Sequence, residues 1–154
     1  MALTVRHVLA HEADRLREIR LRSLASDPDA FGSTYERDAA RPAEWWERSA
    51  ANPEQRTFVA VRGADEWVGM ALVRPGEGAA AVINAMWVAP EARGRGAGRA
   101  LVDACCAWAH ERGFEAVMLS VRSANAPARA AYAAAGFECL RAEGDELVLK
   151  RALV

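Results

Sequence analysis

The first quarter of the chain changes from strand-like to helix-like patterning. Residues 3–8 alternate between apolar and polar side chains, which predicts a half-buried strand. From residue 11 to residue 25, apolar side chains recur at helical spacing and charged side chains fill the outer positions, which predicts an amphipathic helix. We expect this helix to end at Asp27, because the residue before a proline disfavours the helical conformation.

Residues 27–42 follow neither period, and we expect a long irregular segment there, of the kind that is usually functional or mobile. The segment contains Phe31 and Tyr35. Residues 42–51 predict a short second helix that carries two tryptophans, which either pack onto a sheet or form one wall of a binding site.

The rest of the chain alternates strands with helices. Strands are predicted at residues 56–62, 67–74, 79–88, 115–121, 137–140 and 146–150, and helices at residues 97–112 and 123–136. The strand at 79–88 is continuously apolar, as central strands are. Because a helix and another buried strand follow it, the pattern predicts a parallel crossover unit within an α/β (α+β) domain.

A glycine-rich turn lies between the strand at 79–88 and the helix at 97–112. Glycine permits positive φ angles and lets a ligand approach the main chain closely. The first N–H groups of a helix have no internal partner, and the helix dipole adds partial positive charge at that end. The turn therefore predicts a seat for a phosphate group, flanked by arginines. Its glycines and arginines are Arg93, Gly94, Arg95, Gly96, Gly98 and Arg99.

Two common phosphate-binding templates do not fit this turn. The nucleoside-triphosphate loop ends in Gly-Lys-Ser/Thr, whereas the single lysine of the chain is Lys150. The dinucleotide fingerprint requires Gly-x-Gly-x-x-Gly, and its third glycine, counted from Gly94, would fall on Arg99. An ordinary strand-to-helix turn without a ligand is a third alternative for the turn taken by itself.

Another phosphate-binding template matches the turn. The pattern Arg-x-x-Gly-x-Gly, formed here by Arg93, Gly96 and Gly98, resembles the pyrophosphate-binding motif of the GNAT superfamily of N-acetyltransferases. A second block, residues 125–137, resembles the Asn…Tyr…Gly-Phe signature of the same family. The two blocks stand in the family's order, with a predicted helix and a predicted strand between them. The resemblance is specific from about residue 79 to residue 137.

The resemblance implies a fold and a reaction. It implies that residues 1–154 form one GNAT domain, with a mixed, largely antiparallel, seven-stranded sheet flanked by about four helices on both faces. In that fold the fourth and fifth strands splay apart, and the pantetheine arm of acetyl-CoA enters the gap. The implied reaction transfers the acetyl group of acetyl-CoA to a primary amine of a small molecule, by direct attack through a tetrahedral intermediate. The intermediate's oxyanion needs a hydrogen-bond donor.

The resemblance also implies roles for individual residues. Tyr132 would be the catalytic residue and would protonate the sulfur as a general acid, unless it is a packed core tyrosine. Asn125 would contact the CoA arm, and it also suits a helix N-cap. Main-chain groups around Met86 and Val88 would bind the pantetheine amides and polarise the thioester carbonyl. The cofactor-binding residues around the pyrophosphate would be Arg93, Gly94, Arg95, Gly96, Ala97, Gly98 and Arg99.

The acceptor side departs from the family pattern. Many members carry a glutamate in the fourth strand as a general base, and the matching position here is Asn84, which cannot accept a proton at neutral pH. Water, or an acid of the 27–42 segment such as Glu36 or Asp38, would then remove the proton. Alternatively, the acceptor amine has a low pKa and needs no base. The acids and aromatics of residues 27–47 suit a cationic amine, or else form a solvated acidic loop over packed aromatics. The predicted substrate-binding residues are Phe31, Tyr35, Glu36 and Asn84.

Composition narrows the remaining choices. The 154 residues include 52% hydrophobic residues, enough for the core of one domain. The net charge is −1, and no apolar run reaches the length of a membrane span, so we expect neither a nucleic acid nor a membrane as partner. The cysteines and histidines show no metal-ligand spacing, so we expect no metal and free thiols in a cytoplasmic protein. A homodimer is an expectation by analogy only.

Two other functions compete with the small-amine acetyltransferase. A protein acetyltransferase would share the motifs and act on a chain N-terminus or a lysine. A catalytically inactive CoA-binding module would keep the motifs and lack the base, as Asn84 suggests.

Overall fold

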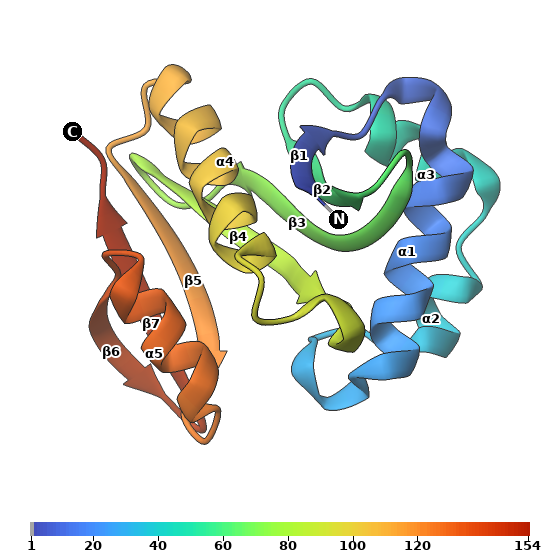
Figure 1. The fold of residues 1–154 in the computed structure, drawn as a ribbon. Coiled ribbons are helices and arrows are strands. Elements are labelled where there is room, and N and C mark those ends of the chain that lie inside the picture. The colour runs from blue at the N-terminus through green and yellow to red at the C-terminus, as the bar shows by residue number, and fades with distance from the viewer. Residues whose placement is uncertain (1) are drawn as a thin grey trace.

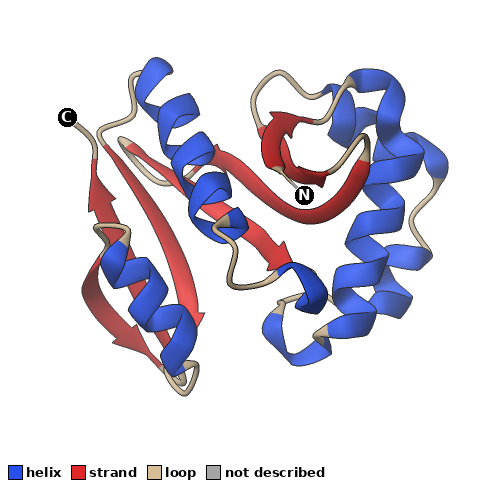
Figure 2. Ribbon diagram, viewed as in Figure 1, coloured by secondary structure: helices blue, strands red, loops and turns tan. Residues whose placement is uncertain are grey.

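The computed structural model describes residues 2–154 as a mixed sheet with helices packed around it (Figure 1, Figure 2). The strands are β1 (Leu3–His7), β2 (Arg56–Arg62), β3 (Glu66–Pro75), β4 (Ala80–Val88), β5 (Ala116–Arg122), β6 (Glu138–Glu143) and β7 (Glu146–Ala152). The α-helices are α1 (Ala13–Ser26), α2 (Tyr35–Ala39), α3 (Ala43–Ala51), α4 (Ala97–Glu111) and α5 (Ala126–Ala134). Short 3-10 turns occur at Ala10–Glu12 (η1), Pro28–Ala30 (η2) and Pro90–Ala92 (η3).

The seven strands are ordered β1-β2-β3-β4-β5-β7-β6, and each neighbouring pair is antiparallel except β4 and β5. This confirms the predicted mixed, largely antiparallel sheet. The parallel pairing is short, because only Ala80–Val82 pair with Ala116–Met118. Beyond that point β5 continues with β7 as its only partner, and β4 and β5 diverge visibly in Figure 1. The sheet therefore opens at its centre.

A bulge in β4 lies on the edge of this opening. Met70 pairs with Trp87 and Leu72 with Asn84, so the register between β3 and β4 shifts around Ala85. Ala85 has a φ of 55°, a conformation that side-chain-bearing residues rarely adopt, and it is the one such non-glycine residue in 2–154. Bulges of this kind bend a strand and redirect its side chains, often beside functional sites.

Helices α1 and α4 cover opposite faces of the sheet. A Cβ placed on Gly69 of β3 would lie 3.3 Å from the Leu101 side chain of α4. The next residue, Met70, lines a cavity together with Leu16 and Arg20 of α1. Because successive strand residues point to opposite faces, the two helices lie on the two sides of β3. In Figure 1, α4 and α5 lie in front of the sheet, and α1–α3 group together on the right.

Two predictions about local structure need correction. Residues 27–42 are not one irregular segment, because they contain η2 and the helix α2. Thr34 is the N-cap of α2, because its hydroxyl oxygen accepts a hydrogen bond from the Arg37 N–H. The sequence around it has no apolar period that would have indicated a helix. This helix makes the α-helices five in residues 2–154, where about four were expected. Strand β4 is also only partly buried, because its far half borders the opening.

Candidate active site

Two cavities, of about 690 Å³ and 480 Å³, meet at the opening between β4 and β5. We name the larger one the arginine cavity and the smaller one the glycine cavity, after the residues that distinguish them. A ligand that spans both cavities would pass the residues common to the two linings. These shared residues are Ala30, Phe31, Met86, Asn125, Ala128 and Tyr132.

The glycine cavity is built on the turn that leads into α4. Gly94 and Gly96 have φ angles of 78° and 87°, which L-residues with side chains rarely adopt. A Cβ at either position would meet no protein atom within 4 Å, so both glycines face open space. Gly96 is the N-cap of α4, and Ala97 and Gly98 begin the helix. The main chain is therefore bare on the side that faces the cavity.

The main-chain N–H groups that follow Arg93 in this turn have no partner in the part of the chain that the structure describes. Across residues 2–154, no hydrogen bond is donated by the N–H groups of residues 94–99, and the first helical bond runs from Ala100 to Gly96. The first turn of α4 also contains no acidic residue. Unpaired N–H groups at the positive end of a helix form a site for an anion such as phosphate.

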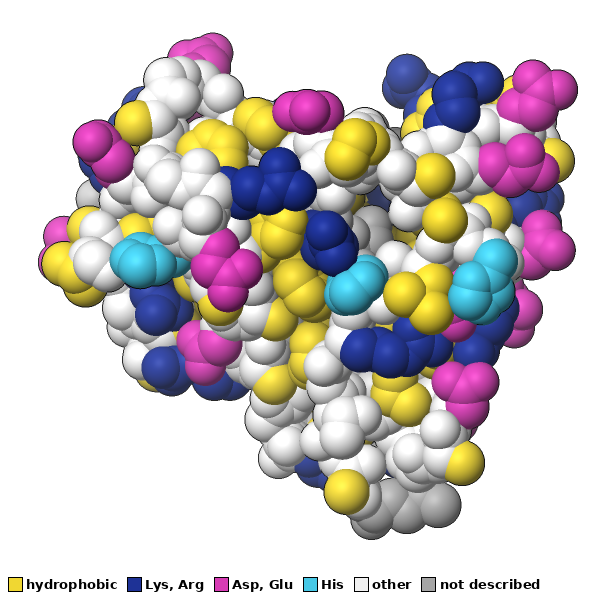
Figure 3. All heavy atoms as spheres, turned by 90° about the horizontal axis from the view of Figure 1, so that it is seen from above, with side chains coloured by type: hydrophobic (Ala, Val, Ile, Leu, Met, Phe, Trp, Pro, Cys, Tyr) yellow, Lys and Arg dark blue, Asp and Glu magenta, His cyan; other side chains and the backbone are white. Residues whose placement is uncertain are grey.

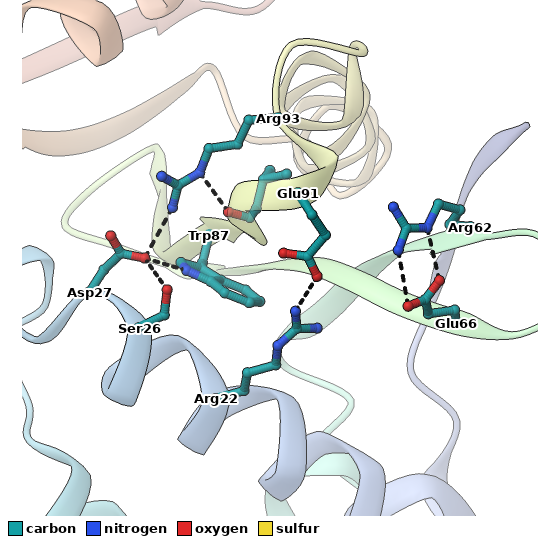
Figure 4. Close-up of polar contacts among 9 residues, drawn as sticks. Arg22, Ser26, Asp27, Arg62, Glu66, Trp87, Glu91 and Arg93 are labelled. Atoms are coloured by element: carbon teal, nitrogen blue, oxygen red, sulfur yellow. Dashed lines mark hydrogen bonds and ion pairs between the residues drawn. The ribbon is translucent and has the colours of Figure 1, made fainter. Parts of the chain in front are cut away.

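Arg93 is directed at the protein itself. Its Nε–H donates to the Val88 carbonyl oxygen over 2.8 Å, and its guanidinium lies 3.0 Å from a carboxylate oxygen of Asp27 (Figure 4). The same oxygen accepts hydrogen bonds from Trp87 Nε1 at 2.7 Å and the Ser26 hydroxyl at 2.9 Å. Burial alone would raise the pKa of Asp27, but these donors bring it below its ordinary value. Asp27 thus ties the end of α1 to β4 and the glycine turn.

A second contact holds α1 against the same loop. Arg22 of α1 pairs with Glu91 in η3, and its guanidinium lies 5.3 Å from the centre of the Trp87 ring (Figure 4). From the sequence, Asp27 is predicted to be the end of a helix and one of the acids of residues 27–47. Its contacts with Trp87 and Arg93 could not be predicted, because these residues are far apart in the chain.

The other two arginines of the turn differ in placement. Arg99 lines the glycine cavity, and its guanidinium donates to the Asp103 carboxylate and to the Ala134 carbonyl oxygen at 3.2 Å. It therefore joins α4 to the end of α5. Arg95 is exposed and lines neither cavity.

Tyr132 and Asn125 come from α5 and reach both cavities. The Asn125 side chain accepts the Ala128 N–H at 3.2 Å, so Asn125 caps the helix as its sequence position allowed. The Tyr132 ring packs against Phe137 with 5.8 Å between ring centres, and its hydroxyl has no hydrogen-bond partner in residues 2–154. Burial, with a smaller contribution from the Cys105 thiol, raises the pKa of Tyr132 to about 12. The phenol is therefore protonated at neutral pH.

The arginine cavity carries more positive than negative side chains. Its aromatic and apolar lining includes Phe31, Trp45, Leu72 and Ile83. The lining contains four arginines and two carboxylates, namely Arg20, Arg41, Arg74 and Arg122, and Asp38 and Glu146.

Asp38 is already neutralised by its neighbours. Its buried carboxylate lies 3.0 Å from Arg20 Nε and 3.1 Å from Arg41 Nε, and it accepts the Ser33 hydroxyl at 2.8 Å. Burial would raise the pKa of Asp38, but the Ser33 hydroxyl and the two guanidinium groups lower it. One further nitrogen of Arg20, Nη1, is buried without a hydrogen-bond partner. The group therefore keeps an excess positive charge and an unused donor.

Asn84 holds an arginine at the position where a base was expected. Arg74 Nε donates to the Asn84 side-chain oxygen at 2.6 Å, and both residues line the arginine cavity. Of the predicted acceptor residues, Phe31 and Asn84 line this cavity, whereas Tyr35 and Glu36 line neither cavity. Both residues lie in the first turn of α2 and are exposed, whereas Asp38 is the buried residue of this helix. Of the acids in residues 27–47, Asp38 alone lines the arginine cavity.

Metal-binding groups are dispersed over the described chain. Within residues 2–154 there is no group of three His, Cys, Asp or Glu residues that could hold a metal ion. The histidine side chains visible in Figure 3 lie apart, on a face where basic and acidic side chains are mixed. Cys105 and Cys106 are buried free thiols, and Cys139 is an exposed one. None of the described helices is long and apolar enough to cross a membrane.

A family model described as "Acetyltransferase (GNAT) family" matches residues 15–137, which is most of the chain and includes both motif blocks. The chain belongs to the GNAT family. The match spans α1 to the start of β6, and so it covers both walls of the opening between β4 and β5.

Relatives and solved structures agree with this assignment. This GNAT chain is 32% identical over 119 residues to mycothiol acetyltransferase of Beutenbergia cavernae, covering 77% of the chain but only 39% of that relative. It is 34% identical over 109 residues to aminoglycoside N(6')-acetyltransferase type 1 of Stenotrophomonas maltophilia, and the match covers 66% of this chain and 71% of that relative. A PaiA N-acetyltransferase from Thermoplasma acidophilum, solved with coenzyme A, matches with a TM-score of 0.75 at 15% identity, covering 99% and 100%. At that identity the structural match shows the fold alone.

Proposed function

We propose that this chain transfers the acetyl group of acetyl-CoA to a primary amine of a small molecule. The observation that carries the proposal is the row of unpaired N–H groups at residues 94–99, which lies in one lining with Tyr132. The named relatives support the acceptor class, because the two of them are a mycothiol acetyltransferase and an aminoglycoside acetyltransferase.

The glycine cavity fits a CoA diphosphate. In this proposal the N–H groups of residues 94–99 bind the phosphates, and the positive end of α4 favours their charge. The coenzyme supplies the acetyl group as a thioester. Main-chain groups of β4 beside the Ala85 bulge, around Met86 and Val88, border the gap and would orient the pantetheine arm. Arg93 fixes the Val88 carbonyl instead of contacting phosphate.

Tyr132 would donate a hydrogen bond to the sulfur of the leaving group. Its raised pKa keeps the phenol protonated, and its free hydroxyl has no competing partner in the described chain. A thiol has a reference pKa of about 8.5, so a phenol with a higher pKa stabilises the departing thiolate by hydrogen bonding more than by complete proton transfer. The Asn125 side chain accepts the Ala128 N–H and so stabilises the first turn of α5, the helix that carries Tyr132.

The acceptor ammonium must lose a proton before it attacks. Asn84 cannot accept one, and two arginines hold Asp38 in its ionised, paired form. Glu146 is the other carboxylate on the lining of the arginine cavity, and the described residues offer its side chain no ion pair. We therefore assign to Glu146 the role of proton acceptor, acting through water.

A CoA-binding module without catalysis is the second candidate. It is favoured by Asn84, which occupies the position of the family's glutamate and is engaged by Arg74. The same lining could then bind a ligand that regulates the protein.

Calorimetry and a turnover assay together test the proposal. We expect acetyl-CoA to bind and at least one member of a panel of amino acids, amino sugars and aminoglycosides to release free CoA. A Cys139→Ser background removes the exposed thiol that would react with the detection reagent. Binding without turnover of any amine would favour the regulatory module, and absence of binding would contradict both functions.

A further inference from the structure

The arginine cavity has a charge that does not suit a polycationic acceptor. A cavity for such a molecule is expected to offer unpaired carboxylates. Here Asp38 is enclosed by Arg20 and Arg41, which leaves that group net positive, and Glu146 is the one carboxylate on the described lining that has no ion pair. Arg122 is paired with Asp145, outside the lining, so it contributes little of the remaining charge.

Arg74 is the cation on the lining with no acidic partner. Its Nε–H is bound to the Asn84 oxygen at 2.6 Å, and one terminal nitrogen donates weakly to the Pro75 carbonyl at 3.3 Å. The other terminal nitrogen has no partner in residues 2–154. Asn84 thus fixes the guanidinium without neutralising it, since an amide oxygen carries no charge. A glutamate at this position would have formed an ion pair and removed the free charge.

The position of Arg74 is close to the predicted chemistry. Asn84 immediately precedes the Ala85 bulge, and Met86 follows it at the junction of the two cavities. A group bound by Arg74 therefore sits on the same strand as the main chain proposed to orient the thioester. The apolar lining supplied by Phe31, Leu72 and Ile83 would contact the body of the molecule.

From this arrangement we infer that the acceptor is an amine that also carries a carboxylate, and that Arg74, positioned by Asn84, binds the carboxylate. The inference rests on the proposed acetyltransferase function for the amine, but the carboxylate site can be tested without turnover. Guanidinium groups bind carboxylates with strong, directional hydrogen bonds, and the buried Nη1 of Arg20 adds a second unused donor to the same lining.

Three probes of one shape separate charge from packing. Hydrocinnamate, its neutral amide and 3-phenylpropylamine share the phenylethyl body and carry at one end a carboxylate, a neutral amide and an ammonium group, respectively. Their binding is measured by calorimetry, on the protein alone and on the protein saturated with CoA. We expect hydrocinnamate to bind with a Kd about tenfold or more below that of the amide, as one charge-assisted hydrogen bond would give. Binding of 3-phenylpropylamine should be the weakest of the three.

Two variants assign the preference to a residue. Arg74→Gln should reduce the ratio of the two Kd values to about one, by removing the charge-assisted contact. Arg37→Gln removes an arginine of α2 that lines neither cavity, and it should leave the ratio unchanged. Added salt should reduce the preference of the parent protein and have little effect on Arg74→Gln.

The inference is overturned by tighter or equal binding of the amide or the amine, by no measurable binding of hydrocinnamate, or by a preference that persists in Arg74→Gln. Turnover adds an independent check. If kanamycin, a polycationic aminoglycoside, is acetylated with a higher kcat/KM than every amino acid in the panel, the inference fails while the proposed function stands. A carboxylate preference in a protein that never releases CoA would support the carboxylate site and contradict the proposed acetyltransferase function.

Discussion

The glycine cavity and the arginine cavity meet at Tyr132, but they offer different groups to a ligand: main-chain N–H groups in the first and charged side chains in the second. The glycine cavity presents free main-chain N–H groups from Gly94 and from residues 96–99, beside side chains such as Phe31 and Tyr132. The arginine cavity presents side chains from α1, α2, α3, β2, β3, β4, β5, α5 and β7. The N–H groups of the first cavity come from one short stretch of the sequence, whereas the charged side chains of the second are brought together only by folding.

This difference predicts how each cavity responds to change. A main-chain site tolerates few substitutions, because its donors depend on backbone conformation and on the lack of side chains. A side-chain site can be altered residue by residue, and its ligand changes with it. Within one family, we therefore expect the glycine cavity to keep its ligand while the arginine cavity takes different acceptors.

The largest expected effect comes from Gly96→Glu. The new side chain would fill the space faced by the unpaired N–H groups and put a negative charge where we propose phosphate. We expect CoA binding to fall below detection in calorimetry.

Gly113→Glu is the matched control, since Gly113 also has a positive φ, of 84°, and faces open space at the other end of α4. It imposes the same backbone strain without touching the glycine cavity. Equal loss of CoA binding in both variants would show that strain in α4, and not the phosphate seat, explains the result.

Tyr132→Phe addresses the point where the cavities meet. Removing the hydroxyl should lower kcat by roughly 10²–10⁴-fold, the range for a positioned proton donor, because the leaving thiolate loses its partner. The Kd for CoA should stay the same, since the ring and its contact with Phe137 remain. An unchanged kcat under conditions where chemistry limits the rate would remove Tyr132 from the mechanism.

Asn84→Ala tests whether the arginine cavity can be changed alone. Loss of the 2.6 Å hydrogen bond frees the Arg74 guanidinium, and we expect the KM of a carboxylate-bearing acceptor to rise about tenfold, as for one such bond. The Kd for CoA should not change. A parallel rise in both constants would mean that the two cavities are not independent.

Asp27→Asn should have the smallest effect, because Asp27 acts on the glycine cavity only through its contacts with Arg93 and Trp87. The variant weakens the contacts to Arg93 and Trp87, so we expect a lower Tm and a CoA Kd raised by a few-fold, about 1 kcal/mol or less. Because the folded pKa of Asp27 lies below its ordinary value of 3.8, the parent's advantage is present above that pH. The advantage should disappear as the pH falls through the lower, folded-state pKa. A Tm difference that is the same at pH 7 and pH 3 would contradict this account.

The strands and the glycine turn could be predicted because their signals are local in the sequence. Alternating or continuous apolar runs identified the strands, and the glycines of the turn lie close together in the chain. Helix α2 was missed because three of its five residues are charged and its clearest signal is the Thr34 cap. Short polar helices carry no apolar period to detect.

The arginine cavity could not be predicted because its members are distant in sequence. Arg74 and Arg20 belong to separate elements, and nothing in the sequence indicates that they line one cavity. Asn84 was predicted as a substrate-binding residue at the position of the missing base, and its bond to Arg74 depends on the register between β3 and β4, which the bulge shifts. Asp27 was likewise identified as a helix end, and its ion pair with Arg93 required the folded structure.

The short pairing between β4 and β5 has a consequence for solubility. Strands that lack a neighbour usually lie at the rim of a sheet, where their free main-chain groups invite another chain to add on and aggregate. Here the unpaired edges beyond Val82 and Met118 lie in the middle of the sheet, beside a cavity whose lining includes Phe31 and Tyr132. The outer sides of β4 and β5 are already paired with β3 and β7. The free main-chain groups therefore border a cavity that can hold a ligand, and they do not lie at the rim of the sheet.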